Sequence, residues 1–263
     1  MPERRTIDGV LLDIDGVLTV SWKPLPGAVD TIAWLRRSGT PFLLLSNTTT
    51  PGRRGLAKLL TEAGFDVSPA EIVTAAIATA SYLRTEHPGE RCFLVGAPDL
   101  DDDFDGIEFV QEAADVVVVA GADDAFTWPN LNSALQMLRS GASLVAMHRN
   151  MTWMTAEGLK LDAGAFLVGL EQAAGVGATV VGKPNADFFR QALKMLRLEP
   201  QNVAMVGDDV ENDVLAAQRL GLTGVLVRTG KFAIEKERKT SSAPDHVIDS
   251  VADLVPLLET LSA

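Results

Sequence analysis

The stretch that decides the fold is Val10-Leu11-Leu12-Asp13-Ile14-Asp15-Gly16-Val17-Leu18. In it an apolar run leads into two carboxylates two positions apart, and glycine follows directly. Residues i and i+2 of a strand share a face, so Asp13 and Asp15 project together from the strand's carboxyl end, and Gly16 permits a sharp turn there. Two carboxylates this close repel each other, and the pair therefore needs a bound cation or a shared proton. Taken alone, the stretch also fits an ordinary turn at a strand end.

Further apolar runs recur along the chain and alternate with amphipathic segments. The predicted strands are Val10–Ile14, Phe42–Leu45, Cys92–Val95, Val116–Ala120, Ser143–Met147, Thr179–Val181, Val203–Val206 and Gly224–Val227. The predicted helices are Ala28–Ser38, Arg53–Ala63, Ala70–Arg84, Trp128–Ser140, Ala165–Gly175, Ala186–Leu196 and Glu211–Leu220. Several strands are apolar throughout, which is typical of strands buried on both faces of a parallel sheet. The alternation predicts a doubly wound α/β architecture.

Two further strand ends carry groups suited to an anion. One buried strand opens into Ser46-Asn47-Thr48-Thr49 before a helix, where hydroxyl, amide and backbone N–H donors suit a phosphate. Another is followed by Gly182-Lys183-Pro184, where Lys183 would meet an anion as a point charge. A plain helix N-cap and a solvated surface lysine are the alternatives for these two segments taken singly.

A fourth strand end is followed by Asp208, Asp209 and Asp213. These are more acidic residues than are needed to stabilise the start of a helix. These carboxylates favour a hard cation, with Mg²⁺ preferred because a few carboxylates, waters and a phosphate complete its coordination. The carboxyl edge is where open α/β sheets bind ligands. Four polar segments at four such ends therefore supply a nucleophile, a second carboxylate, phosphate donors, a cation and a metal site, which together indicate phosphoryl transfer.

Composition and charge limit the kinds of molecule that the protein is expected to bind. The 263 residues are 47% hydrophobic and carry a formal net charge of −12, which disfavours a protein that binds nucleic-acid backbones. Cys92 is the only cysteine, no uninterrupted apolar stretch is long enough to span a membrane, and we expect a cytoplasmic protein with no membrane partner. The aspartates between residues 99 and 105 favour a solvated loop over a calcium site, because the glycine and terminal glutamate of an EF-hand are misplaced.

In order and spacing, the four segments resemble the motifs of the haloacid dehalogenase (HAD) superfamily of phosphatases, from Asp13 to about Lys231. The resemblance implies a Rossmann-like core formed by residues 1–75 and 178–263. It also implies an inserted α/β cap formed by residues 76–177, like that of the NagD-like subfamily. Ser46-Asn47-Thr48-Thr49, Val180-Val181-Gly182-Lys183-Pro184 and Leu226-Val227-Arg228-Thr229-Gly230-Lys231 look most like the branch of phospholysine/phosphohistidine/pyrophosphate phosphatases.

The family's roles map onto these positions. The resemblance implies that Asp13 attacks phosphorus and forms an aspartyl-phosphate, and that Asp15 protonates the leaving oxygen and then accepts a proton from water. It implies Mg²⁺ bound by Asp13, the Asp15 carbonyl and Asp208. The other implied roles are orientation of metal-bound water by Asp213 and Asp209, and binding of the phosphoryl oxygens by Ser46, Asn47 and Lys183.

We therefore expect a Mg²⁺-dependent phosphatase for a small phosphorylated metabolite, with pairing of two copies through the cap as a candidate assembly. A phosphotransferase on the same scaffold, or a phospho-acceptor regulatory protein without turnover, are the alternatives. A receiver-like signalling domain would be shorter and would not need Asp15. His148, Arg149, Asn150 and Trp153 follow a predicted cap strand and are candidates for contacting the leaving group, or are ordinary cap residues.

Overall fold

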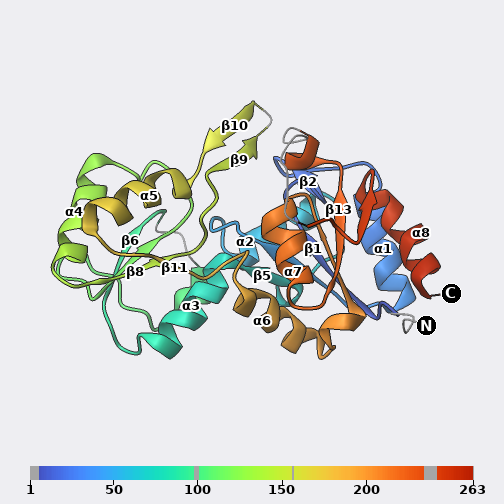
Figure 1. Cartoon of the computed structure of the whole chain (residues 1–263), viewed down its shortest axis with the longest axis horizontal. Coiled ribbons are helices and arrows are strands. Elements are labelled where there is room, and N and C mark those ends of the chain that lie inside the picture. Colours follow the sequence, from blue (N-terminus) through green and yellow to red (C-terminus); the bar gives the residue numbers. More distant parts are fainter. Residues whose placement is uncertain (1–5, 98–100, 156, 234–241, 263) are drawn as a thin grey trace.

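The computed structural model describes residues 6–97, 101–155, 157–233 and 242–262, and these form two α/β lobes (Figure 1). The larger lobe contains a six-stranded sheet in the order β14-β13-β12-β1-β4-β5, in which all pairings are parallel. Its strands are β1 (Gly9–Asp13), β4 (Phe42–Ser46), β5 (Ile72–Thr74), β12 (Val203–Gly207), β13 (Thr223–Val227) and β14 (His246–Ile248). This lobe is the doubly wound core that the alternating pattern predicts.

The smaller lobe, the cap, contains four parallel strands in the order β11-β8-β7-β6. These are β6 (Cys92–Val95), β7 (Val116–Val119), β8 (Ser143–Ala146) and β11 (Thr179–Val180). Two antiparallel hairpins extend from the lobes: the core hairpin formed by β2 (Thr19–Val20) and β3 (Lys23–Pro24), and the cap hairpin formed by β9 (Thr152–Thr155) and β10 (Gly158–Leu161).

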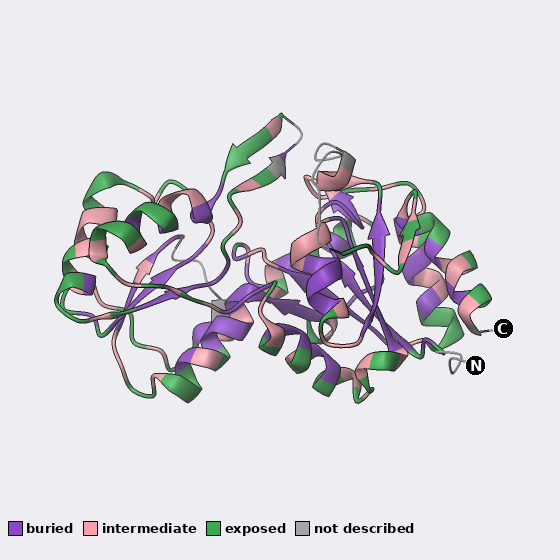
Figure 2. Ribbon diagram, in the orientation of Figure 1, coloured by how far each residue is buried: buried purple, intermediate pink, exposed green. Residues whose placement is uncertain are grey.

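Helices cover both faces of the core sheet, which explains why its central strands are apolar over most of their length. Val10 and Leu12 of β1 pack with α1 (Ala28–Ser38), α2 (Arg53–Glu62) and α8 (Leu254–Ser262). Leu11 faces the opposite layer, which includes α6 (Ala186–Leu196) and α7 (Ala216–Gln218). Figure 2 shows the resulting buried sheet between partly exposed helices. A strand buried on both faces cannot alternate polar and apolar residues, because each face contributes to a core.

The cap is built in the same way and shares one of its layers with the core. Val117 and Val119 of β7 pack toward α4 (Trp128–Arg139) and α5 (Ala163–Ala174). Val116 and Val118 face α3 (Ala75–Glu86), in a cluster that continues to Leu11 of the core sheet. The two lobes therefore meet through packed apolar side chains as well as through the chain connections.

Several expected elements differ in the structure. The helix expected over residues 70–84 begins only at Ala75, because the buried residues Ile72–Thr74 form β5 and Thr74 caps the helix by accepting from the Ile77 N–H. The helix expected over 211–220 is a π-helical segment, η4 (Val210–Leu215), followed by the short α7. The expected core boundary at residue 178 would place β11 in the core, whereas β11 pairs with β8 and continues the cap sheet.

The acidic loop lies partly outside the described residues, since residues 98–100 are not described. Within the described part, Asp103 is not simply solvated: its carboxylate forms an ion pair with Arg53 of α2, at 3.1 Å. This contact links the cap to the core near the N-terminus of α2. Among the described helices, none is long and apolar enough to cross a membrane.

Candidate active site

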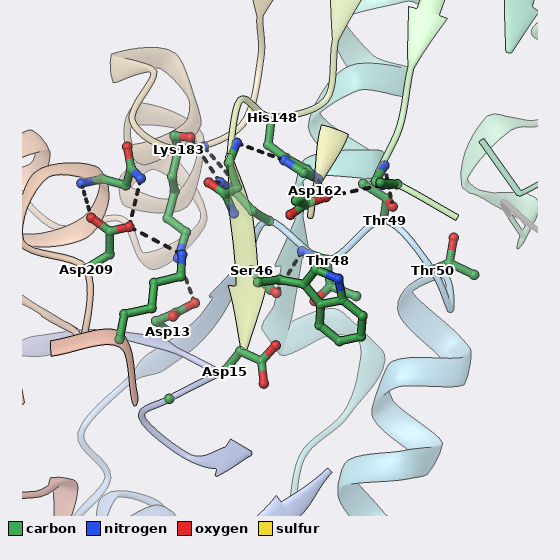
Figure 3. A pocket seen from close by; sticks show the side chains of 18 of the residues that line it. Asp13, Asp15, Ser46, Thr48, Thr49, Thr50, His148, Asp162, Lys183 and Asp209 are labelled. Atoms are coloured by element: carbon green, nitrogen blue, oxygen red, sulfur yellow. Dashed lines mark hydrogen bonds and ion pairs between the residues drawn. The ribbon is translucent and has the colours of Figure 1, made fainter. Parts of the chain in front are cut away.

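The carboxyl edge of the core sheet brings the four polar segments together. Asp13 ends β1, which lies between β12 and β4, so Asp208 and Ser46 flank it from the two neighbouring strands. Lys183 approaches from the segment that returns from the cap, just after β11. Figure 3 shows Lys183 directed at Asp13, with the Asp15 carboxylate turned away from that pair. The structure therefore brings these residues together at one edge of the core sheet.

Lys183 lies at the centre of the charge network. Its Nζ is 2.6 Å from Oδ1 of Asp13 and 2.7 Å from Oδ1 of Asp213. Burial lowers the pKa of Lys183, but the two carboxylates outweigh burial and raise it, so the ammonium stays charged. A buried cation held this way is fixed in position and is oriented for an incoming anion.

Asn47 holds the backbone of Lys183 in place. Its Oδ1 accepts from the Lys183 N–H at 2.9 Å, and its Nδ2 donates to the Lys183 carbonyl at 3.0 Å. The same Nδ2 lies 3.5 Å from Oδ1 of Asn150 in the cap. The Asn47 backbone or side chain was expected to contact the phosphoryl group. These hydrogen bonds commit the side chain to positioning Lys183, so the backbone N–H is the group left for an anion.

Three buried carboxylates form a cluster suited to a metal ion. Asp13, Asp208 and Asp213 each offer an oxygen, and these oxygens lie within 4.8 Å of one another. Burial, followed by the charges of Asp13 and Asp213, raises the pKa of Asp208 well above its usual range, and burial raises the pKa of Asp213 to about 7. Carboxylates that repel in this way fit a hard divalent cation. Asp213, expected to orient metal-bound water, lies within the cluster itself.

Asp209 has a different environment from its neighbour Asp208. Its Oδ1 accepts from the N–H groups of Glu211 and Asn212 and so caps η4, while its Oδ2 lies 3.3 Å from Nζ of Lys231. Burial opposes ionisation, but Lys231 and the Asn212 hydrogen bonds lower the pKa of Asp209. The Asp209 carboxylate therefore forms an ion pair with Lys231 at the edge of the cluster formed by Asp13, Asp208 and Asp213.

Asp15 has the properties of a carboxylic acid that keeps its proton near neutral pH. Burial, followed by repulsion from Asp13, raises its pKa to about 7. Proton donors in catalysis need a pKa near the working pH. The environment of Asp15 therefore separates its role from that of Asp13, although only Ile14 lies between them in the chain.

The loop after β13 also reaches this site. The backbone N–H of Lys231 donates to Oδ2 of Asp208 at 2.7 Å, and the Thr229 hydroxyl donates to the Gly16 carbonyl at 2.5 Å. A Cβ added at Gly230 would lie 2.0 Å from Oδ2 of Asp208, so glycine is required there. Lys231 received no role from the sequence, although its segment was among those that resembled the family. The feature of the sequence that could have identified Lys231 as a site residue was its position shortly after the end of a buried strand.

A cavity of about 370 Å³ opens between the core edge and the cap. The cap supplies His148, Asn150 and Trp153, three of the four residues considered as candidates for the leaving group. The fourth, Arg149, instead pairs with Glu171 of α5 at 2.9 Å. The core hairpin adds Trp22 to the cavity wall, which was not anticipated.

His148 is buried and uncharged. Burial lowers its pKa, and its Nδ1 accepts from the Asn150 N–H at 3.3 Å, which leaves the ring proton on Nε2. Nε2 lies 3.8 Å from Oδ1 of Asp162, a buried residue that caps α5. Thr49 of the core joins this group, since its Oγ1 accepts from the Gly121 N–H at 3.0 Å. These contacts seat the cap directly on the segment after β4.

Comparison with known proteins agrees with this geometry. A family model for haloacid dehalogenase-like hydrolases matches residues 10–110, and a second, HAD-hydrolase-like model matches residues 180–254. The chain is 35% identical to the phospholysine phosphohistidine inorganic pyrophosphate phosphatase of Rattus norvegicus, covering 96% of this chain and 94% of the relative. It is 36% identical to the haloacid dehalogenase-like hydrolase domain-containing protein 2 of Bos taurus, covering 93% of each.

Solved structures show the same likeness over the whole chain. The p-nitrophenyl phosphatase from Archaeoglobus fulgidus superposes with a TM-score of 0.85 at 30% identity, covering 96% of this chain and 99% of that one. NagD from E. coli K-12 gives 0.84 at 29% identity, covering 94% and 98%.

The chain therefore belongs to the haloacid dehalogenase-like hydrolases, and it is a phosphatase. Within that class it is a NagD-like member with an α/β cap, near the phospholysine/phosphohistidine/pyrophosphate phosphatases.

Proposed function

We propose that this protein is a Mg²⁺-dependent phosphatase of a small phosphorylated metabolite and that it works through an aspartyl-phosphate on Asp13. The observation that carries the proposal is the contact of Asp13 with Lys183 inside a cluster of three buried carboxylates that lines the cavity between the core and the cap. Such a site brings a nucleophile, a fixed cation and metal ligands to one point, as phosphoryl transfer requires.

The environment of each catalytic side chain supports a particular step of the reaction. A carboxylate oxygen of Asp13 attacks phosphorus while Asp15, which is still protonated below about pH 7, donates its proton to the leaving oxygen. Ionised Asp15 then removes a proton from the water that attacks phosphorus and releases Asp13. Lys183, Ser46 and the Asn47 N–H stabilise the phosphoryl oxygens.

Asp13, Asp208 and Asp213 are the side chains that would hold Mg²⁺, with the Asp15 carbonyl as a further ligand. The buried, mutually repelling carboxylates are the evidence that the site fits a cation. When bound, Mg²⁺ offsets the repulsion between these acids and the phosphate.

We also propose that the protein works in the cytoplasm and pairs with a second copy through the cap. Sedimentation of the purified chain at several concentrations measures the pairing. A monomer at every concentration would contradict it.

The function is tested by assaying a panel of phosphorylated metabolites with and without Mg²⁺, with Asp13→Asn as the inactive reference. We expect phosphate release that needs Mg²⁺ and that falls on the order of 10³-fold or more in Asp13→Asn, because the nucleophile is lost. Asp187→Asn is the matched control, since Asp187 is exposed on α6 and lies outside the cavity. Undiminished turnover in Asp13→Asn, with the fold intact by circular dichroism, would contradict the assignment.

A further inference from the structure

The cap side of the cavity carries negative charge, whereas a second phosphate on the substrate would need positive charge there. Two carboxylates from the cap line it, those of Asp123 and Asp162, and His148 there is neutral. Among the lining residues that the structure describes, the lysines are Lys183 and Lys231, both from outside the cap sheet and both already paired with core carboxylates. A negatively charged leaving group would therefore face carboxylates without a cation to pair with.

The cavity is also lined by two tryptophans, one from the cap hairpin and one from the core hairpin. Trp153 lies on β9 of the cap hairpin and is 40% exposed, and Trp22 is half-buried at the tip of the core hairpin. Figure 1 shows the cap hairpin reaching out from the cap on the same side as β2 of the core. An indole ring offers a large apolar face and attracts flat or cationic groups.

Trp22 occupies a backbone position that a bulky residue rarely adopts. Ser21 and Trp22 form the two-residue connection between β2 and β3, with φ of 49° and 62°. Two positive φ values define a turn in which Asn-Gly is favoured, because side chains crowd the backbone there. Trp22 is thus held in place against the local conformational preference, and its side chain both packs against the core cluster around α1, α2 and α8 and lines the cavity.

We propose that the leaving group of the natural substrate carries an aromatic ring and no negative charge, and that Trp22, Trp153 and Asp123 select it. The ring packs against the two indoles, while the cap carboxylates repel substrates with a second phosphate or a carboxylate. This inference rests on the proposed phosphatase function and concerns only which phosphate esters the site accepts.

A charge series on one aromatic scaffold tests the selection. Phenyl phosphate, 4-carboxyphenyl phosphate and 4-(aminomethyl)phenyl phosphate differ in the charge of the leaving group. We expect kcat/KM for the carboxylated ester to be on the order of tenfold below that of phenyl phosphate, and that for the amino ester to equal or exceed it. Equal or higher kcat/KM for the carboxylated ester would overturn the charge selection. If none of the three were hydrolysed while another phosphate ester of the metabolite panel was, the selection of an aromatic leaving group would be overturned and the proposed phosphatase function would stand.

Asp123→Asn probes the charge at one position. Asp123 is exposed, and its Oδ1 accepts from the Ala125 N–H, a bond that asparagine can keep. We expect the variant to raise kcat/KM for the carboxylated ester several-fold relative to kcat/KM for phenyl phosphate. Asp124→Asn is the matched control, because Asp124 is also exposed but does not line the cavity. The same gain in both variants would show a general charge effect and overturn a role for Asp123.

Tryptophan substitutions probe the stacking. Trp22→Leu and Trp153→Leu should each raise KM for phenyl phosphate about 3- to 10-fold, with a smaller effect on methyl phosphate, which has no ring. Trp128→Leu is the control, since Trp128 is 77% exposed on α4 and lies outside the cavity. Trp153 is also exposed on its hairpin, so its variant should fold even if Trp22→Leu does not. Equal losses with the aromatic and methyl esters would overturn the stacking role.

Discussion

At the scale of single residues, environment separates carboxylates that look alike in the sequence. Asp13 pairs with Lys183, whereas burial and repulsion raise the pKa of Asp15 to about 7. Asp209 keeps a lowered pKa beside Lys231, although Asp208 next to it has a strongly raised one. Burial and the nearest charge therefore decide which acid carries a proton and which acts as an anion.

The raised pKa of Asp15 predicts the pH dependence of the reaction. Asp15 must be protonated to assist the departure of a poor leaving group, so kcat/KM for an alkyl phosphate should fall as pH rises through about 7. Asp15→Asn should lower the rate and remove this descending limb. The measurement is a pH profile of kcat/KM for both proteins. An unchanged limb in Asp15→Asn would assign the ionisation to another group.

At the scale of elements, the close approach of two turns to Asp208 holds the metal ligands together. Gly16 has φ of 86°, and a Cβ there would lie 2.0 Å from Oδ2 of Asp208 and 3.1 Å from the Gly230 Cα. The turns after β1 and β13 can therefore approach Asp208 this closely only because glycine occupies positions 16 and 230. This contact joins the strand ends on both sides of β12 into one site.

Gly16→Ala should weaken the site beyond its effect on stability. We expect kcat/KM to fall at least about tenfold and the Mg²⁺ concentration for half-maximal activity to rise, because Asp208 must move. Gly39→Ala is the matched control: Gly39 also has a positive φ, of 73°, but a Cβ there meets nothing within 4 Å. It should lose about 1–2 kcal/mol of unfolding free energy from the left-handed backbone and keep its activity. Equal activity losses in both variants would contradict the crowding at Asp208.

The sequence predicted long elements and strand-end motifs better than short strands. β5 was merged into the helix at Ala70–Arg84 because Ile72 and Val73 run into an alanine-rich segment without a helix breaker. β14 is three residues long at a sheet edge, where only its pairing with β13 defines it. Asp13, Lys183 and Asp208 were found from their positions after buried strands, whereas the roles of Asn47 and Trp22 depend on contacts between segments distant in the chain.

At the scale of the whole molecule, the excess of acid at the sheet edge links stability to pH and to metal. Burial raises the pKa of Asp213 from 3.8 to about 7. The folded chain therefore binds more protons than the unfolded chain in this window, and its free energy of unfolding falls as pH rises from about 4 to 7. A divalent cation bound to the same carboxylates replaces the protons and restores stability.

Mg²⁺ should consequently raise Tm more at about pH 8 than at about pH 5.5. The expected difference is at least about 2–4 °C, the equivalent of roughly 1 kcal/mol for a protein of this size. Differential scanning calorimetry of the wild type and of Asp208→Asn measures it, with K⁺ at equal ionic strength as the control. The same Tm increase at both pH values would show that Mg²⁺ binds elsewhere.

The central claim is that Asp13 carries the phosphoryl group during turnover, and rapid-quench analysis of Asp15→Asn tests it most directly. With p-nitrophenyl phosphate the leaving group needs no proton, so the first step should proceed while the second step, which needs Asp15 as a base, is slow. The account predicts a stoichiometric burst of nitrophenolate, with the phosphoryl group found by mass spectrometry on the peptide that contains Asp13. Steady turnover without a burst, with that peptide unmodified, would contradict it.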